Sequence, residues 1–353
     1  MHENSGLSGR LEDVSEYTGL NAGNDCLFVS DAYDYGGTGA DGLTTEQYAI
    51  VRMTESVSMS EIGRTFLDGA ISYDPETDTV DPTLVCVNNG MEPLGLFTPD
   101  YDLIEVDLEN TFYDPETGMI GGINSVPQVL MQDGVLHTYV MNTYMEELAH
   151  GYQAFYLDNF DPSYDQFFHP ADEKVWNLAV EAQAKVMGAV GIVEYEAETG
   201  KNIVEPFVQE FQGTVAAEMV GRVKSLYDQH GAEFIHENPE YLAPVFESFF
   251  HNAEALDAYY AQGADYINGI DSLDRVSIEH FEQAFGQIPG FEAGMLDGRY
   301  SSMEDLADIM PEGRTKSFLQ ESFDAAHNGE VGPRIEAPQQ PGPSNAPGMA
   351  PGA

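Results

Sequence analysis

The sequence predicts an α+β protein that is predominantly helical and has one small antiparallel sheet. Apolar residues recur every three or four positions through most of the chain after residue 138, which is typical of helices buried on one side. Short apolar or alternating runs are concentrated in an earlier segment, 84–108, and predict strands. With 353 residues, the chain is long enough to bury a substantial core.

The N-terminal segment 1–44 is rich in Gly, Asp and Asn, and we expect an irregular arm with one short strand at 26–29. Thr44 or Thr45 can cap a helix that runs through Arg52, and Ser60 can open the next one. Strands follow at 84–87 and 103–108. The repeated sequence Tyr-Asp-Pro-Glu-Thr, at 73–77 and 113–117, predicts turns. It lacks the alternating ligands and central Gly of a calcium loop.

Long helices are predicted at 136–157, 172–195 and 205–229, with another starting at Pro244. Between 275 and 327 we expect shorter helices broken at Pro289 and Pro311. The expected organisation is the arm 1–44, a main domain 45–270 and a C-terminal helical extension 271–330. The Pro- and Gly-rich tail 331–353 has the composition of a disordered segment.

The charge balance is extreme, with 61 acidic against 13 basic residues and a formal net charge of −48. Such a field repels phosphate backbones and anionic membrane surfaces, so neither a nucleic acid nor a membrane is an expected partner. Two interpretations stay open. The acidic surface, which has only five lysines, suits a protein that works in high salt, or it attracts a cationic partner.

Two cysteines, Cys26 and Cys86, allow one disulfide but no Cys-based zinc site. The N-terminus lacks a basic segment followed by an apolar one, and the most apolar stretch, 186–193, is too short to span a bilayer. These observations predict a cytoplasmic protein.

A candidate for chemistry is Glu-Glu-Leu-Ala-His at 146–150, within the predicted helix 136–157. Positions 146 and 150 lie side by side one turn apart, with 147 on the same flank. The zinc-peptidase pattern His-Glu-x-x-His uses this geometry, with two metal ligands and a Glu as general base. Here Glu146 stands at the first ligand position. Taken alone, the pattern is also typical of a solvated Glu–His pair, and Glu233 and His236 repeat its spacing.

A third ligand is expected from the following helix, where Glu181 begins Glu-Ala-Gln-Ala. This order of strand pair, metal helix and Glu-bearing helix resembles the zincins whose third ligand is glutamate. More narrowly, it resembles an uncharacterised bacterial family of metallopeptidase-like proteins. The likeness covers roughly 45–300 and rests on short motifs at 94–100, 146–153, 181–184, 246–250 and 257–260. It implies a zincin-like domain whose sheet packs on the metal-site helix, ligation by His150 and Glu181, and Glu147 as general base.

The departure at Glu146 changes the expected chemistry. Two carboxylates and one imidazole would nearly neutralise a divalent ion, so a bound water would be less acidic, and selectivity would move from zinc toward manganese or calcium. Without a metal, Glu146, Glu147 and Glu181 would crowd together, and one of them would take up a proton. No compensating cation is nearby in sequence. His169, in the loop between the two helices, is a possible replacement ligand.

Two functional hypotheses follow. The first is a metal-dependent hydrolase of peptidase type, acting on a peptide or protein, with a divalent metal held by Glu146, His150 and Glu181 and with Glu147 as base. The metal would be zinc or manganese. The second is a non-catalytic relative that keeps the zincin-like fold and serves as an acidic binding or structural protein, with a cationic partner. Glu146 is the residue that separates them.

Overall fold

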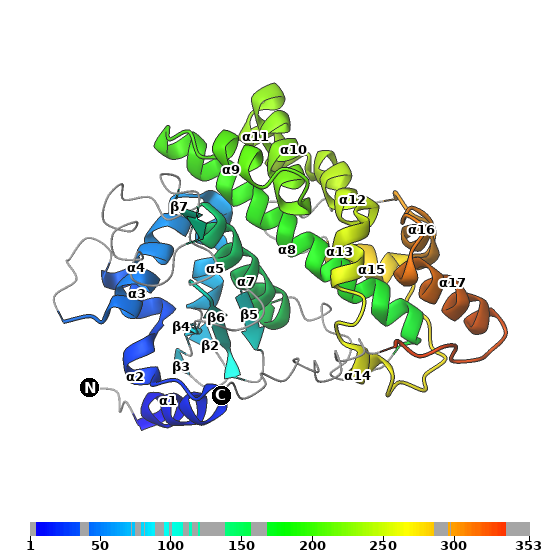
Figure 1. Ribbon diagram of the computed structural model, residues 1–353, viewed down its shortest axis with the longest axis horizontal. Helices are drawn as coiled ribbons and strands as arrows, with labels where there is room; N and C mark the ends of the chain where they lie inside the picture. The colour runs from blue at the N-terminus through cyan, green and yellow to red at the C-terminus, as the bar shows by residue number, and fades with distance from the viewer. Residues whose placement is uncertain are drawn as a thin grey trace, which may run out of the picture.

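The computed structural model describes residues 5–35, 42–71, 73–74, 79–80, 82–88, 95–98, 101–108, 113–114, 119–120, 138–156, 168–285, 296 and 298–336. Helix α8 (Pro170–Thr199) crosses the middle of the molecule (Figure 1). The sheet, the N-terminal helices and α7 (Thr138–Tyr156) lie on one side of it, and the C-terminal helices lie on the other. The predominantly helical α+β class is confirmed.

The N-terminal segment, predicted to be an irregular arm, contains three helices, α1 (Ser5–Thr18), α2 (Ala22–Asp25) and α3 (Val29–Tyr35). Tertiary contacts explain the difference. Val14 and Ala22 join a small core with the strands, and the Arg10 guanidinium donates to the carbonyl oxygens of Pro82 and Tyr101. Such contacts override weak local propensity.

The next two helices begin where the sequence predicted. In α4 (Thr45–Val57), the Thr44 side chain accepts from the backbone N–H of Gln47, and the Gln47 side chain completes a capping box. In α5 (Glu61–Ala70), the Ser60 side chain accepts from the N–H of Gly63. Both caps satisfy helix donors that would otherwise lack partners.

The main sheet has four strands in the order β1 (Cys26–Phe28), β4 (Leu84–Val87), β6 (Leu103–Val106) and β5 (Gly95–Thr98). β4 and β6 are parallel, whereas the two outer pairs are antiparallel, so the predicted antiparallel sheet is wrong for the central pair. Both central strands are buried along their whole length, as parallel strands covered on both faces are.

A disulfide joins Cys26 to Cys86, which face each other across the antiparallel pair β1–β4. It ties the N-terminal helices to the central strands across a sequence separation of 60 residues. Two further two-stranded sheets are formed by β2 (Tyr73–Asp74) with β3 (Thr79–Val80), and by β7 (Tyr113–Asp114) with β8 (Met119–Ile120). The predicted turns between their strands lie outside the described residues.

The predicted helix 205–229 is two helices, α9 (Val204–Glu210) and α10 (Val215–His230). Gly213 takes a positive φ of 97°, and the Thr214 side chain then accepts from Ala217 N–H to start α10 afresh. The remaining helices are α11 (Ala232–Glu237), a 3₁₀-helix (Pro239–Leu242), α12 (Ala243–His251), α13 (Ala253–Ala258), α14 (Ala264–Ile267), α15 (Ile278–Phe285), α16 (Met303–Asp308) and α17 (Arg314–His327). Pro289 and most of the tail, 337–353, lie outside the described residues.

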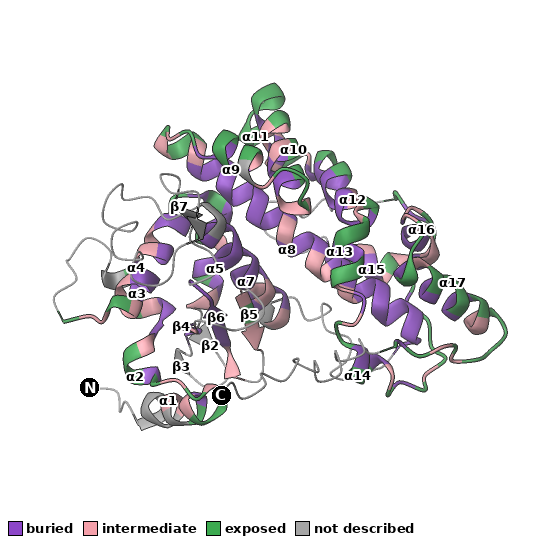
Figure 2. Cartoon of the chain, viewed as in Figure 1, coloured by how far each residue is buried: buried purple, intermediate pink, exposed green. Residues whose placement is uncertain are grey.

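Helix α8 is buried along most of its length (Figure 2) and is roughly 45 Å long at 1.5 Å per residue. Two of its glycines let α7 approach closely. A Cβ on Gly188 would lie 3.1 Å from the Asn142 Oδ1 atom, and one on Gly191 would overlap the end of the Met145 side chain. This close packing brings the polar strip of α7 against α8. Among the described residues, no helix is both long and apolar enough to cross a membrane.

Candidate functional site

The predicted site residues lie where α7 packs against α8. Glu146 and Glu147 are buried, and His150 is partly buried, all on α7. Glu181 on α8 faces them, because its carboxylate lies 3.6 Å from the His150 Nε2 atom. The polar strip predicted on this helix is therefore an interior surface between two helices, not a solvated face. The interpretation of 146–150 as an exposed Glu–His pair is wrong.

Glu146, the unexpected residue of the motif, has both carboxylate oxygens engaged. Its Oε2 atom accepts a hydrogen bond from the Lys185 ammonium at 2.8 Å, and its Oε1 atom accepts from the Asn142 amide. Burial lowers the pKa of Lys185, but Glu146, together with Tyr259 and Glu181, outweighs burial and raises the pKa well above its usual value. Lys185 is therefore a permanent cation at the first ligand position.

His150 and Glu181 form the second charge pair. Burial lowers the pKa of His150, but the neighbouring Glu181 carboxylate outweighs it and raises the pKa to about 9. Burial likewise works to raise the pKa of Glu181, and His150 lowers it to about 2. Each of the two groups thus favours the charged form of the other.

A chain of amides orients the His150 ring. The Gln153 Oε1 atom lies 2.9 Å from His150 Nδ1, the Gln153 Nε2 atom donates to Gln183, and Gln183 donates to the carbonyl oxygen of Phe285. Because a carbonyl oxygen can only accept, this end of the chain sets the direction of each amide, and His150 Nδ1 must carry a proton. Nε2 is then the nitrogen that faces Glu181.

The loop after α13 braces the other side of the site. The Gln262 side chain donates to Glu181 at 2.8 Å, and the Tyr259 ring lies 5.6 Å from the Lys185 ammonium. The fully buried Lys174 donates to the carbonyl oxygens of both Tyr259 and Gln262. This lysine therefore ties the loop to α8, and through the loop it positions Gln262 beside Glu181.

Glu147 differs from the other two carboxylates. It is 8% exposed and receives no hydrogen bond from any residue that the structure describes. Burial, assisted by the negative charges of Glu181 and Glu146, raises its pKa to about 7. Its carboxylate lies against β5, where a Cβ on Gly95 would come within 2.5 Å of the Glu147 Oε1 atom. A larger residue at this position would force the Glu147 and Thr143 side chains to shift.

The donor set fits a metal ion in part. His150 Nε2 and Glu181 Oε2 are 3.6 Å apart, close to the separation of about 3.4 Å between two tetrahedral zinc ligands. Glu146 does not fit, because a metal could reach it only after the Lys185 hydrogen bond broke. Consistent with this, no group of three metal-ligating side chains occurs among the described residues.

His169, the possible replacement ligand, has another role. It is buried at the start of α8, where its Nδ1 atom accepts from Ala171 N–H and its Nε2 atom contacts the Glu330 carbonyl oxygen. The residues that sequence reasoning missed are Lys185 and Gln262. The sequence could have indicated Lys185, because it follows Glu181 by one helical turn and so lies on the same face of that helix. Gln262 had none.

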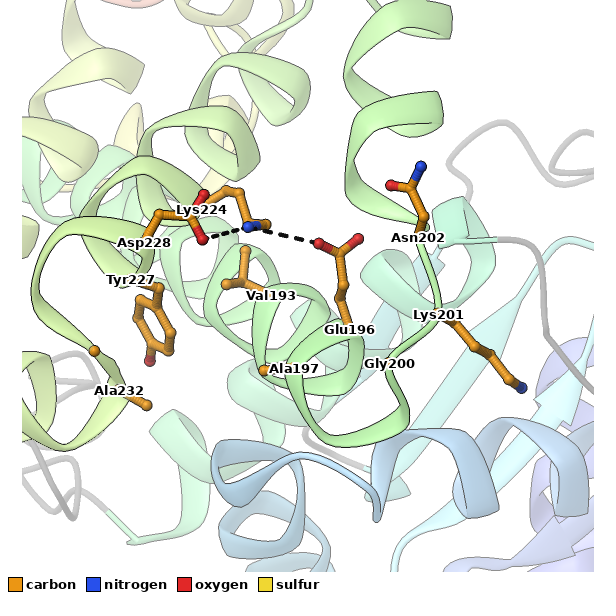
Figure 3. A pocket seen from close by; sticks show the side chains of 11 residues that line it. Val193, Glu196, Ala197, Gly200, Lys201, Asn202, Lys224, Tyr227, Asp228 and Ala232 are labelled. Carbon is orange, nitrogen blue, oxygen red and sulfur yellow. Dashed lines mark hydrogen bonds and ion pairs between the residues drawn. The ribbon is translucent and has the colours of Figure 1, made fainter.

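A separate cavity of about 500 Å³ lies near the end of α8, between α8, α10 and α11. None of the predicted site residues lines it. Figure 3 shows Lys224 between Glu196 and Asp228, to both of which it is paired. Tyr227, which also lines the cavity, donates to the buried Glu194. The charges here are satisfied within the protein.

No family model, curated protein or solved structure matches this chain. The resemblance to the zincins therefore stays a hypothesis that rests on the motifs and on the site.

Proposed function

We propose that this chain is a non-catalytic relative of zincin-type peptidases that serves as an acidic binding protein. The observation that carries the proposal is the hydrogen-bonded ion pair between Lys185 and Glu146. An ammonium group at the first ligand position supplies positive charge where a metal would, and it occupies the carboxylate that the metal would need. The buried carboxylates are thereby balanced without a divalent ion.

The remaining charge of the protein indicates the kind of partner. With a net charge of −48, the surface attracts cationic segments and speeds their encounter. We therefore assign a basic peptide or protein segment as the partner, bound and released intact.

The experiment compares metal content and peptide cleavage in four proteins purified without chelator. These are the wild type, His150→Ala, Lys185→Met, and the double variant Glu146→His with Lys185→Met, which restores the His-Glu-x-x-His pattern. We expect the wild type to hold well under one equivalent of zinc after incubation with zinc and to cleave no peptide. The double variant should hold about one equivalent. One equivalent of metal in the wild type, lost on His150→Ala, would overturn the proposal.

A second candidate, the metal-dependent hydrolase, is favoured by two observations. The 3.6 Å spacing of His150 and Glu181 suits a shared ion, and the pKa of Glu147, about 7, suits a general base. In this function His150 and Glu181 would hold zinc or manganese, which would supply Lewis-acid chemistry. Glu147→Gln should then abolish cleavage while leaving the metal content unchanged.

A further inference from the structure

Glu147 is the carboxylate of the site that no described residue satisfies. Glu146 accepts from Lys185 and Asn142, and Glu181 accepts from Gln262 beside His150. Glu147 is more than nine-tenths buried among them and receives no hydrogen bond from the described part of the chain. An ionised carboxylate buried without a donor costs free energy, so this position favours a ligand that donates to it.

The local charge indicates what that ligand is. Glu146 is paired with Lys185, and Glu181 lies beside His150, whereas Glu147 forms no ion pair with any described residue. One cationic group would therefore complete the pairing of the cluster. An ammonium or guanidinium group supplies both this charge and several N–H donors, and a charge-assisted hydrogen bond is about twice as strong as a neutral one.

The carboxylate is close to the surface. Gly95, against which it lies, is partly exposed and presents no side chain over it. Among the described strands, β5 is an edge of the sheet and pairs with β6 alone. Glu147 thus lies against an outer strand of the described sheet.

We propose that Glu147 receives a single lysine or arginine side chain from the basic partner. This inference rests on the proposed non-catalytic function, and it adds the group that is recognised and the residue that recognises it. The net charge of −48 brings basic segments to the surface without selecting among them, whereas Glu147 selects one cationic side chain.

The test uses blocked pentapeptides that differ only at the central residue, which is lysine, arginine or the uncharged isostere norleucine. Binding is measured by calorimetry in 1 M KCl, where the Debye length of about 3 Å suppresses the general field. We expect lysine and arginine peptides to bind at least tenfold more tightly than norleucine. Glu147→Gln should abolish this preference, and Glu198→Gln, which removes an exposed charge from the same helix pair, should retain it.

Equal affinities for lysine and norleucine in the wild type would overturn the inference, as would a preference that survives Glu147→Gln. If Glu147→Gln does not fold by circular dichroism, Gly95→Ala replaces it, because its added Cβ would crowd the carboxylate. Mass spectrometry of the recovered peptides separates the two proposals. Cleaved peptide with bound zinc would overturn the proposed function itself, whereas intact peptide without a lysine preference would overturn only the role of Glu147.

Discussion

The Lys185 ammonium donates a 2.8 Å hydrogen bond to the Glu146 carboxylate across the interface of α7 and α8. Both side chains are nearly buried, at 13% and 12% exposed, and they lie 39 residues apart in sequence. The glutamate that makes the motif depart from the zinc-peptidase pattern is thus matched by a cation from the facing helix.

Lys185→Met should destabilise the protein strongly, because it leaves the Glu146 carboxylate buried without its counter-ion. Removing one partner of a buried pair costs about 3–5 kcal/mol. Replacing both residues by apolar ones, as in Glu146→Leu with Lys185→Met, should cost much less. The free energy of unfolding from urea titration measures both. Lys201→Met, at a partly exposed lysine, is the control and should change it by under about 1 kcal/mol. Equal losses for Lys185→Met and Lys201→Met would contradict the structural role of the pair.

Glu147→Gln should stabilise the protein at pH 8 and have little effect at pH 5. The folded pKa of Glu147 is about 7, above its ordinary value of 4.5, so the folded state holds its proton more tightly than the unfolded state. Ionising this carboxylate therefore lowers stability as pH rises from 4.5 through 7, by on the order of 3 kcal/mol at about 1.4 kcal/mol per pKa unit. Melting temperatures of the variant and the wild type across this range measure the effect. A difference that does not change with pH would contradict it.

His236→Gln should lower stability at pH 6 more than at pH 9. The His236 Nε2 atom lies 2.7 Å from the buried Glu194 carboxylate, whose hydrogen bond raises the pKa of His236 above its ordinary 6.5. For a raised pKa, the stabilisation is fully present below 6.5 and is lost as pH rises through the folded value. Denaturant titrations at the two pH values test this. His251→Gln, which removes an imidazole at an exposed position, is the matched control variant.

Reduction of the Cys26–Cys86 disulfide should lower the free energy of unfolding by about 4 kcal/mol, the loop-closure value for a cross-link of this span. Cys26→Ser with Cys86→Ser should match the reduced protein. Disulfides persist in oxidising compartments and are rare in the cytosol, so this bond argues against the predicted cytoplasmic location. Thiol titration of protein isolated under alkylation decides the point. Two free thiols in the native protein would contradict both statements.

Molar KCl should raise the melting temperature, because screening over about 3 Å removes the self-repulsion that a net charge of −48 creates. Thermal melts in 0.05 M and 2 M KCl test this expectation. Sucrose at matched water activity is the control for general exclusion effects. A melting temperature that falls in KCl would contradict the expectation.

Local signals located much of the fold. The caps at Thr44 and Ser60 predicted where two helices begin, and the apolar spacing from Met141 to Tyr152 predicted α7. Features that depend on contacts between residues distant in sequence were predicted wrongly. The helices α1 to α3 are stabilised by packing on strands and by Arg10, and the parallel pairing of β4 and β6 depends on how the intervening chain folds.

By itself, the sequence determined the helical class, the acidic surface and the position of Glu146, Glu147 and His150 on one helix, because these follow from composition and from the helical repeat. It also marked Glu181 on the next helix. Only the tertiary structure decided that Lys185 reaches Glu146, that Gln262 reaches Glu181 and that Glu147 is left without a described donor. The physical reason is that these contacts join residues far apart in sequence. The first depends on the close approach of α7 to α8 at Gly188, and the second joins Glu181 to Gln262, 81 residues later. No local sequence pattern encodes either contact.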